Sequence, residues 1–470
     1  MAMTTEPPGP GTPAHPGAPG PPGPPDPVAL LRSRGYVGLL VMAAVLGVPI
    51  AAAAYGFLAL VTYLQEEIFT HLPHGLGFAT EPVWWPLPVL AVGGVLAALA
   101  IRYLPGGGGP SPAGGFKIHG PPTPSQLPGV ILAALATLVF GAVLGPEMPL
   151  IAIGGGLAVL ATKLARRRQV PAQGVKVLAS AGSFAAISTL LGSPLTGAFL
   201  LMEASGLGAP TLGLLLVPGL VASGVGALIF VGLDNLTGLG TFSLAIPGLP
   251  PVSHPYGSEF AWAIVIGVAA ALLGPALQWL GRLVQQYAQR WTMLVVPLAG
   301  LLIAGLAIGY AQATGKPASD VLFSGESALG PLIKNSASYT VGALLLLLAC
   351  KGLAYGVSLG SFRGGPVFPA MFVGAAGGIA LSHLPGLPLI AGAAMGIGAM
   401  CVVMLTLPLT SVLLATLLLG SDGLAVMPVV IVAVVVAYVA AARIAPRPAT
   451  PPAPAAGSHM RASPPASDQS

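Results

Sequence analysis

Long apolar runs constrain this chain more than any other feature of its sequence. Stretches of about 20 residues begin near Gly35 and recur to about Ala442, and each could cross about 30 Å of hydrocarbon as a helix. In lipid the backbone must be hydrogen-bonded within a helix or a closed barrel, and these runs lack the alternation of a barrel strand. The chain is therefore predicted to be an all-α polytopic membrane protein, with membrane lipid as its main surroundings.

The charge content agrees with a membrane body. Only 7% of the 470 residues are charged, whereas about 25% is usual for a soluble domain. The formal net charge of +5 reflects basic loops, so no nucleic-acid partner is expected. Cys350 and Cys401 lie within apolar runs and are interpreted as small core residues.

The apolar runs fall into two halves between low-complexity tails. Residues 1–34 and 445–470 are rich in Pro, Gly, Ala and Ser and are predicted to be disordered. Residues 35–234 form a first membrane repeat, and residues 260–444 form a second. Residues 235–259 are interpreted as the linker between the two repeats.

Basic residues predict the orientation. Arg32 and Arg34 precede the first apolar run, and the densest basic cluster extends from Lys163 to Lys176. Lysine and arginine concentrate in cytoplasmic loops of membrane proteins. We therefore expect both tails to be cytoplasmic, in a plasma membrane of the bacterial type.

Glu147 is the acidic residue that most needs an explanation. Of 13 acidic residues, only Glu147 and Glu203 lie within the apolar body; the others, Glu326 among them, are assigned to tails and connections. An ionisable group in hydrocarbon is costly and normally marks an ion or proton path. Glu147 follows Pro146, which favours the first turn of a helix that begins inside the membrane. The positive end of that helix can hold the carboxylate or a small anion, so Glu147 is predicted to be a gate; the alternative is a structural carboxylate.

The second half repeats this broken-helix pattern. Gly145-Pro146-Glu147-Met148-Pro149 and Gly365-Pro366-Val367-Phe368-Pro369 both precede an apolar, glycine-containing helix, and a Pro-Leu-Thr segment follows each. Broken helices at matching positions in two halves indicate a transport site at their interface, and converging helix N-termini favour an anion. The predicted anion-binding residues are Gly145, Pro146, Met148, Gly365, Val367 and Phe368.

Three segments resemble the CLC family of chloride channels and chloride/proton exchangers. The family's Gly-Arg/Lys-Glu-Gly-Pro motif is similar to residues 145–149, its Gly-x-Phe-x-Pro motif to residues 365–369, and its Pro-Leu-Ala-Gly stretch to residues 194–197. The resemblance covers most of residues 36–444. It implies a CLC-like fold of two inverted-topology repeats with broken and re-entrant helices. It also implies a homodimer that transports chloride or a similar anion, with no cofactor or metal.

Three positions depart from the family pattern. Where the family has Gly-Ser-Gly-Ile-Pro, this chain has Gly108-Gly109-Pro110-Ser111-Pro112. The stretch is interpreted either as a linker or as an anion site in which Gly109 replaces the serine and Ser111 supplies the hydroxyl. At the position of the exchangers' proton-transferring glutamate stands Ala204, which leaves neighbouring Glu203 as the candidate for a proton path. The family's last-helix tyrosine has no counterpart after Arg443.

The residues together predict transport of small inorganic anions, most of all chloride, by a glutamate-gated, channel-like pathway with weak or no proton coupling. A chloride/proton antiporter that uses Glu203 is the first alternative. An intramembrane hydrolase built on Glu147 and Glu203 is disfavoured, because neither a His-Glu-x-x-His nor a Gly-x-Ser-x-Gly motif is present. A non-conducting membrane scaffold is the remaining alternative. The chain is not expected to be an enzyme.

Overall fold

The computed structural model describes residues 32–117, 120–164, 171–205, 209–238, 245–249, 255–420 and 423–444. Within these ranges all regular structure is helical, and the β-type pairing is a single isolated bridge. Eight of the described helices are long and apolar enough to span a membrane. The prediction of an all-α polytopic membrane protein is confirmed.

Several features of the sequence lie outside the described residues. They include most of both tails, part of the linker with His254, and Arg166 to Arg168 of the basic cluster. The described part of the linker differs slightly from the expectation. Helix α9 continues to Thr237 and α10 begins at Gly257, so Glu259 lies in the first turn of α10, where its carboxylate accepts a hydrogen bond from the Tyr256 N–H.

The helices of the first half are, in chain order, α2 (Arg34–Glu66), the π-helix η1 (Glu67–His71), α3 (Leu72–Gly75), α4 (Pro86–Tyr103), the 3₁₀ turn η2 (Pro112–Gly114), α5 (Leu127–Leu138), α6 (Glu147–Leu164), α7 (Ala172–Leu190), α8 (Pro194–Ser205) and α9 (Ala209–Thr237). Those of the second half are α10 (Gly257–Arg290), α11 (Thr292–Thr314), the 3₁₀ turn η3 (Ala318–Asp320), α12 (Glu326–Lys334), the 3₁₀ turn η4 (Ser336–Ser338), α13 (Val341–Ser361), α14 (Val367–Leu381), α15 (Leu389–Leu405), α16 (Pro408–Leu418) and α17 (Gly423–Ile444).

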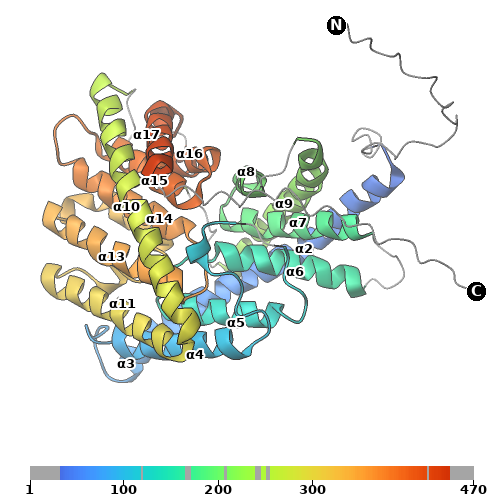
Figure 1. The fold of residues 1–470 in the computed structure, drawn as a ribbon, viewed down its shortest axis with the longest axis horizontal. Helices are drawn as coiled ribbons and strands as arrows, with labels where there is room; N and C mark the ends of the chain where they lie inside the picture. Colours follow the sequence, from blue (N-terminus) through green and yellow to red (C-terminus); the bar gives the residue numbers. More distant parts are fainter. Residues whose placement is uncertain are drawn as a thin grey trace, which may run out of the picture.

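Helix packing in the two halves follows one scheme. Helix α6 packs on α7, and α14 packs on α15 in the same way; α2 packs on α9 as α10 packs on α17. In Figure 1 the green helices α6 to α9 lie to the right of the yellow to red helices of the second half, and the two halves meet where α4 lies beside α11 and α8 beside α16. The matched pairs account for the repetition of motifs in the sequence.

Glycines allow the innermost helices to touch through their backbones. A Cβ atom on Gly154 of α6 would collide with the carbonyl oxygen of Gly182 in α7. In the second half, a Cβ atom on Gly378 of α14 would collide with the carbonyl oxygen of Gly392 in α15. Small residues at such crossings permit the close backbone approach that stabilises helix pairs in membranes.

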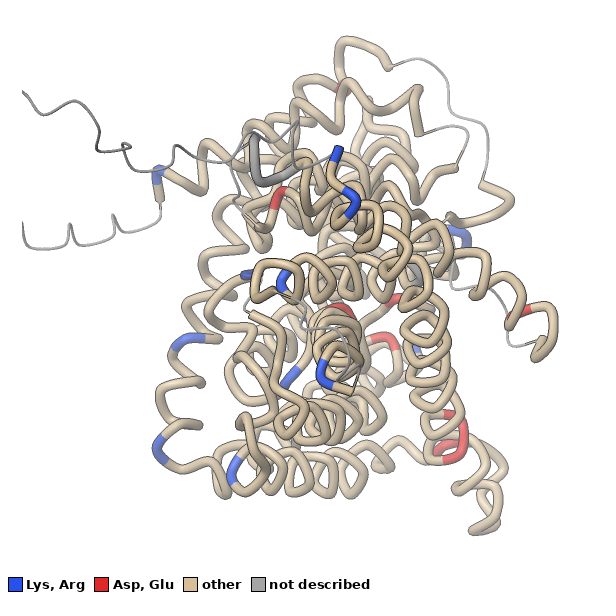
Figure 2. The backbone as a smooth tube through the Cα atoms, turned by 90° about the vertical axis from the view of Figure 1, so that its right-hand side faces the viewer, with Lys and Arg blue, Asp and Glu red and all other residues tan. Residues whose placement is uncertain are grey.

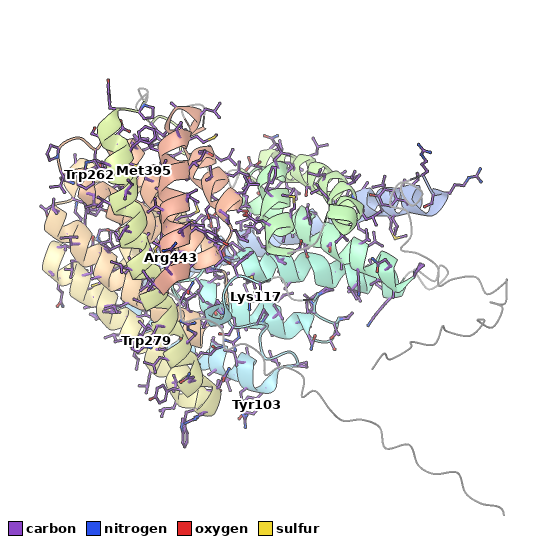
Figure 3. All side chains as sticks on the ribbon, turned by 45° about the horizontal axis from the view of Figure 1, so that its top comes forward. Tyr103, Lys117, Trp262, Trp279, Met395 and Arg443 are labelled. Atoms are coloured by element: carbon purple, nitrogen blue, oxygen red, sulfur yellow. The ribbon has the colours of Figure 1, made fainter. Side chains whose placement is uncertain are left out.

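The outer surface is apolar. Figure 2 shows how few charged positions the tube carries, and the aromatic side chains of Tyr103 and Trp279 lie on the outside of the helical body (Figure 3), with exposed fractions of 70% and 61%. Leu228 and Leu424 are each 74% exposed as well. Such a surface suits contact with lipid rather than with water.

The crossing of α14 and α15 predicts opposite effects at two neighbouring glycines. Gly378→Ala should lower the free energy of unfolding by about 1–3 kcal/mol, because the methyl group would push α14 away from Gly392. Gly377→Ala is the matched control. Its nearest neighbour would be a Leu348 methyl carbon at 4.0 Å, so it should be neutral or stabilise the helix by about 0.5–1 kcal/mol. Thermal unfolding in detergent measures both effects, and equal effects of the two substitutions would contradict the packing argument.

Candidate functional site

Two broken helices meet at the centre of the site. The chain leaves α5 at Leu138 and resumes a helix at Glu147, and it leaves α13 at Ser361 and resumes at Val367. Between these helices Gly145 and Gly365 exchange two backbone hydrogen bonds, of 2.8 and 2.6 Å. The non-helical segments therefore satisfy one another's polar groups, as irregular backbone within a membrane protein requires.

The Glu147 carboxylate lies against the start of the opposite helix. The side chain is fully buried, and the N–H of Phe368 donates a hydrogen bond of 2.8 Å to Oε1. Oε2 is buried and has no hydrogen-bond partner among the described residues. A Cβ atom on Gly365 or on Gly145 would overlap this carboxylate. The negative charge of the first repeat thus occupies the positive N-terminal end of α14 in the second.

The structure brings most of the predicted anion-site residues together. Gly145, Gly365 and Phe368 surround the Glu147 carboxylate, and Val367 is the fully buried first residue of α14. Pro146 lies just before α6, where its carbonyl oxygen accepts the hydrogen bond of the Leu150 N–H. Met148 is only half-buried and lies at a cavity that is described next.

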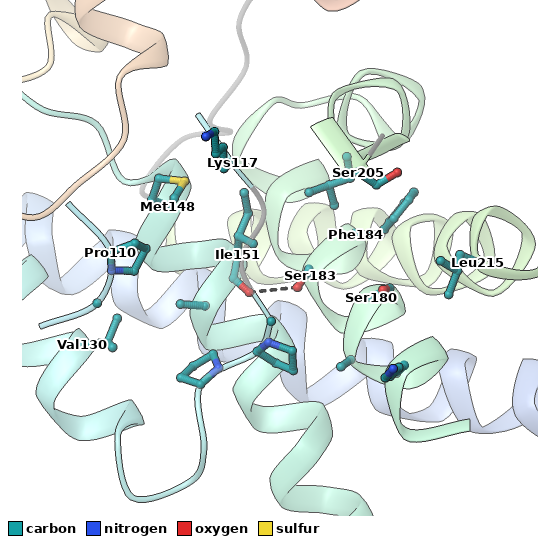
Figure 4. Close-up of a pocket in the computed structure, with 18 of the residues that line it drawn as sticks. Pro110, Lys117, Val130, Met148, Ile151, Ser180, Ser183, Phe184, Ser205 and Leu215 are labelled. Carbon is teal, nitrogen blue, oxygen red and sulfur yellow. Dashed lines mark hydrogen bonds between the residues drawn. The ribbon is translucent and has the colours of Figure 1, made fainter. Parts of the chain in front are cut away.

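A cavity of about 780 Å³, here called the lysine-lined cavity, reaches the start of α6. Met148 and Ile151 border it from α6, Gly109 and Pro110 from the glycine-rich loop, and Lys117 and Lys176 supply its positive charge. Figure 4 shows Lys117, Pro110 and Met148 around this space, and the bond from Ser183 Oγ to the Ile151 carbonyl oxygen. Lysines at the wall of a cleft raise the local concentration of anions.

Of the two residues of the glycine-rich loop that were predicted to bind the anion, Gly109 lies at the lysine-lined cavity and Ser111 does not. Gly109 borders the lysine-lined cavity, and its N–H donates to the carbonyl oxygen of Gly106 at 2.9 Å. Ser111 is not among the residues that line the cavity, and its hydroxyl group donates to the Leu359 carbonyl oxygen at 3.3 Å. The Ser111 hydroxyl therefore ties the loop to α13.

A second cavity, of about 380 Å³, is lined in part by Phe368 and is here called the glutamate-lined cavity. Its wall includes Glu326, Lys334 and Asn335. Glu326 begins α12, which lies outside the eight candidate spans. Burial raises the pKa of Glu326 to about 8, and the charge of Glu147 raises it as well. Glu326 lies beside a glycine-containing connection, as expected. Its place at this cavity was not foreseen, and an acidic residue at the start of a short helix in a polar segment was the available signal.

Lys351 is a buried cation that the sequence argument also missed. Its ammonium group lies 4.3 Å from the Phe372 ring centroid and donates to the consecutive carbonyl oxygens of Asp320, Val321, Leu322 and Phe323 at 2.9–3.4 Å. One turn further along α13, the Tyr355 hydroxyl group donates to the Pro366 carbonyl oxygen at 2.8 Å. Helix α13 thus positions both the segment before α12 and the start of α14. A lysine inside an apolar run was the signal for this role.

Glu203 caps another helix. One carboxylate oxygen accepts from the Leu409 N–H at 3.0 Å, and the other accepts from the Thr410 N–H and hydroxyl group at 2.8 and 2.6 Å. These donors form the N-terminus of α16, so Glu203 satisfies groups that a helix end leaves open. Ala204 beside it is half-buried. The geometry favours the structural interpretation of Glu203 over a proton path.

Comparison with known protein sequences gives a coherent set of relatives. A family model described as "Voltage gated chloride channel" matches residues 93–442. The protein named "Putative ion-transport protein YfeO" of Escherichia coli O1:K1 / APEC is 32% identical over 368 residues, which cover 76% of this chain and 82% of that protein. Its namesake in Shigella boydii serotype 4 (strain Sb227) shows the same identity and coverage.

Solved structures agree on the fold. A slow cyanobacterial Cl-/H+ antiporter superposes with a TM-score of 0.72 at 20% identity, over 87% of this chain and 95% of that chain. A CLC-type fluoride/proton antiporter gives a TM-score of 0.61 at 18% identity, over 86% and 95%. A eukaryotic CLC transporter gives 0.65 at 15% identity, over 88% and 73%.

The cap on α16 predicts a stability effect. Glu203→Ala should lower the free energy of unfolding by about 1–2 kcal/mol, because it removes the acceptor for two backbone N–H groups and one hydroxyl group. Thr410→Val removes only the hydroxyl donor and should cost less. Thermal unfolding in detergent measures both, with Glu66→Ala at an exposed position as control. No destabilisation by Glu203→Ala would show that the cap is unimportant.

Proposed function

Because the chain belongs to the voltage gated chloride channel family, we propose that it carries small inorganic anions, chloride foremost, through a glutamate-gated, channel-like path with weak or no proton coupling. The resemblance that the three motifs indicated is confirmed by this membership. The CLC-like fold of an integral membrane protein is confirmed with it. We further propose a homodimer in a bacterial-type plasma membrane, with both tails in the cytoplasm.

The observation that supports the proposal is that Glu147 lies next to one residue of each cavity. The residue after it, Met148, lines the lysine-lined cavity, and the residue whose N–H it binds, Phe368, lines the glutamate-lined cavity. A fully buried carboxylate thus lies where a path from one cavity to the other would pass. An ion that crosses there would have to replace it.

The proposed gating step is an exchange of one negative charge for another. The Phe368 N–H that holds Glu147 at the end of α14 is a donor that suits a small anion equally well. An arriving anion, or protonation of the carboxylate, releases Glu147 from this donor. The backbone N–H groups of Val367 and Phe368 then replace part of the hydration shell of the anion.

The basic residues at the lysine-lined cavity support an orientation, whereas the other cavity has both an acidic and a basic residue, Glu326 and Lys334. Lys117 and Lys176 line the first cavity, and Arg102 lies in the last turn of α4 ahead of the same loop. We assign the lysine-lined cavity to the cytoplasmic side by the positive-inside rule. The glutamate-lined cavity then faces the exterior, where it gives external protons access to Glu147.

Chloride/proton exchange remains the second candidate, because two of the similar structures are named as a Cl-/H+ antiporter and a fluoride/proton antiporter. Two features of this chain speak against tight coupling. Ala204 carries no ionisable group, and the neighbouring Glu203 carboxylate is occupied by three donors of α16. No other carboxylate stands beside them in the sequence.

The gate predicts a pH effect. Anion flux of the wild type should rise as the external pH falls, because protonation releases the Glu147 carboxylate from the Phe368 N–H. Glu147→Gln should fold and conduct with a flux that no longer depends on external pH, since the titrating group is absent. Chloride efflux from proteoliposomes at a series of external pH values measures this.

Glu326→Gln is the matched control for that experiment, because Glu326 lies in the glutamate-lined cavity but does not bind the Phe368 N–H. This variant should keep the pH dependence. If Glu147→Gln retained the dependence and Glu326→Gln lost it, the titrating gate would be Glu326 and our assignment would be wrong.

Because Ala204 cannot carry a proton and the Glu203 carboxylate caps α16, we predict weak coupling of proton movement to anion transport. A chloride gradient across proteoliposomes should drive anions without building a pH gradient, and Glu203→Gln should preserve the anion flux. Simultaneous recordings with a chloride electrode and a pH dye measure the ratio. Uphill proton movement at a fixed ratio, abolished by Glu203→Gln, would establish the exchanger instead.

A further inference from the structure

Arg363 is a half-buried cation whose partners are all neutral. It lies between α13 and α14, two residues before the paired Gly365. Its Nε donates to the Gly107 carbonyl oxygen at 3.3 Å and its Nη1 to the Phe362 carbonyl oxygen at 3.1 Å. Its backbone N–H donates to the Thr137 hydroxyl oxygen at 3.2 Å. These bonds fix the position of the guanidinium group without neutralising it.

No carboxylate compensates this charge. Among the described residues the one ion pair within 4.0 Å joins His71 to Glu67 near the end of α2. A guanidinium group stays charged in proteins, and removing it from water without an opposite charge is costly. Its Nη2 makes no hydrogen bond to a described residue and is not a fully buried atom. The group therefore keeps unused, accessible donors inside an apolar body.

The position of Arg363 connects it to the lysine-lined cavity. The accepting Gly107 belongs to the loop whose members Gly106 and Gly109 line that cavity. Gly108, between them, has a φ of 73°, and a Cβ atom on it would lie 3.3 Å from Arg363 Cγ. The loop has no side chain at Gly107 or Gly108, so the arginine stem packs closely against the backbone of the loop that borders the cavity.

The other side of Arg363 leads to the gate. Its neighbour Gly364 packs on Leu144 and Gly145, and the next residue, Gly365, forms the paired bonds and contacts Glu147. Arg363 thus contacts the glycine-rich loop through its side chain and leads through its backbone into the segment that contacts the Glu147 carboxylate.

We propose that Arg363 is an anion-binding residue between the lysine-lined cavity and Glu147, and that its free donors bind planar oxyanions such as nitrate more tightly than chloride. The inference rests on the proposed function and names a specificity determinant within it. A guanidinium group presents donors in one plane and can bind two oxygen atoms at once, whereas a halide has no second acceptor atom. Lysine in its place would keep the charge and lose the planar geometry.

The test uses the full chain with Arg363→Gln, Arg363→Lys and the control Arg102→Gln, which alters an exposed arginine in the last turn of α4. Calorimetric titration with sodium nitrate and with sodium chloride gives the two affinities, and proteoliposome flux gives the selectivity. Arg363→Gln should weaken binding of both anions by at least about tenfold. Arg363→Lys should retain chloride binding within about threefold and lose the preference for nitrate. The control should match the wild type.

A purely structural arginine would behave differently. Arg363→Gln would then lower the unfolding temperature while both affinities stayed unchanged, and that result would overturn the proposal. If Arg363→Gln does not fold, Arg363→Lys decides alone: an unchanged nitrate-to-chloride ratio overturns the proposal, and a lost preference supports it. Failure of the proposed function would give a different result. Wild-type proteoliposomes would then carry neither anion, but calorimetry could still measure nitrate binding that depends on Arg363.

Discussion

The paired hydrogen bonds of Gly145 and Gly365 are the interaction on which the site depends. They satisfy two non-helical segments inside an apolar body, where unpaired N–H and C=O groups would be costly. Neither glycine has a positive φ, so the need for glycine comes from close approach. A side chain at either position would occupy the space of the Glu147 carboxylate. The same two glycines therefore allow both the pairing of the broken segments and the placement of the Glu147 carboxylate.

The surrounding helices hold this pairing rigidly. Helix α14 lies backbone to backbone on α15 through Gly378, and its preceding Pro366 carbonyl is held by the Tyr355 hydroxyl group. Lys351, one turn before Tyr355, fixes the segment that leads to α12. One face of α13 therefore sets both the start of α14 and the wall that carries Glu326. A shift of α13 would therefore move the start of α14 and the segment before Glu326 together.

The sequence predicted the features that depend on neighbouring residues in the chain. Apolar runs identified the spans, and the Gly-Pro breaks located Glu147 and Phe368, which the structure joins by a hydrogen bond. It could not place Glu326, because only the path of the segment after α11 brings that carboxylate to the site. Nor could it foresee that the Ser111 hydroxyl group is used on Leu359, since such pairing depends on how distant helices pack.

Two basic side chains near the broken helices, the buried Lys351 and the half-buried Arg363, differ in how many of their donors are used, and this difference separates positioning from binding. An ammonium group has three N–H donors, and Lys351 meets four carbonyl oxygens and an aromatic ring. It has no donor left for a ligand, so its role is to position the chain. Arg363 has five donors but only two side-chain hydrogen bonds. The unused donors therefore belong to Arg363, which is why we assign anion binding to Arg363 and a positioning role to Lys351.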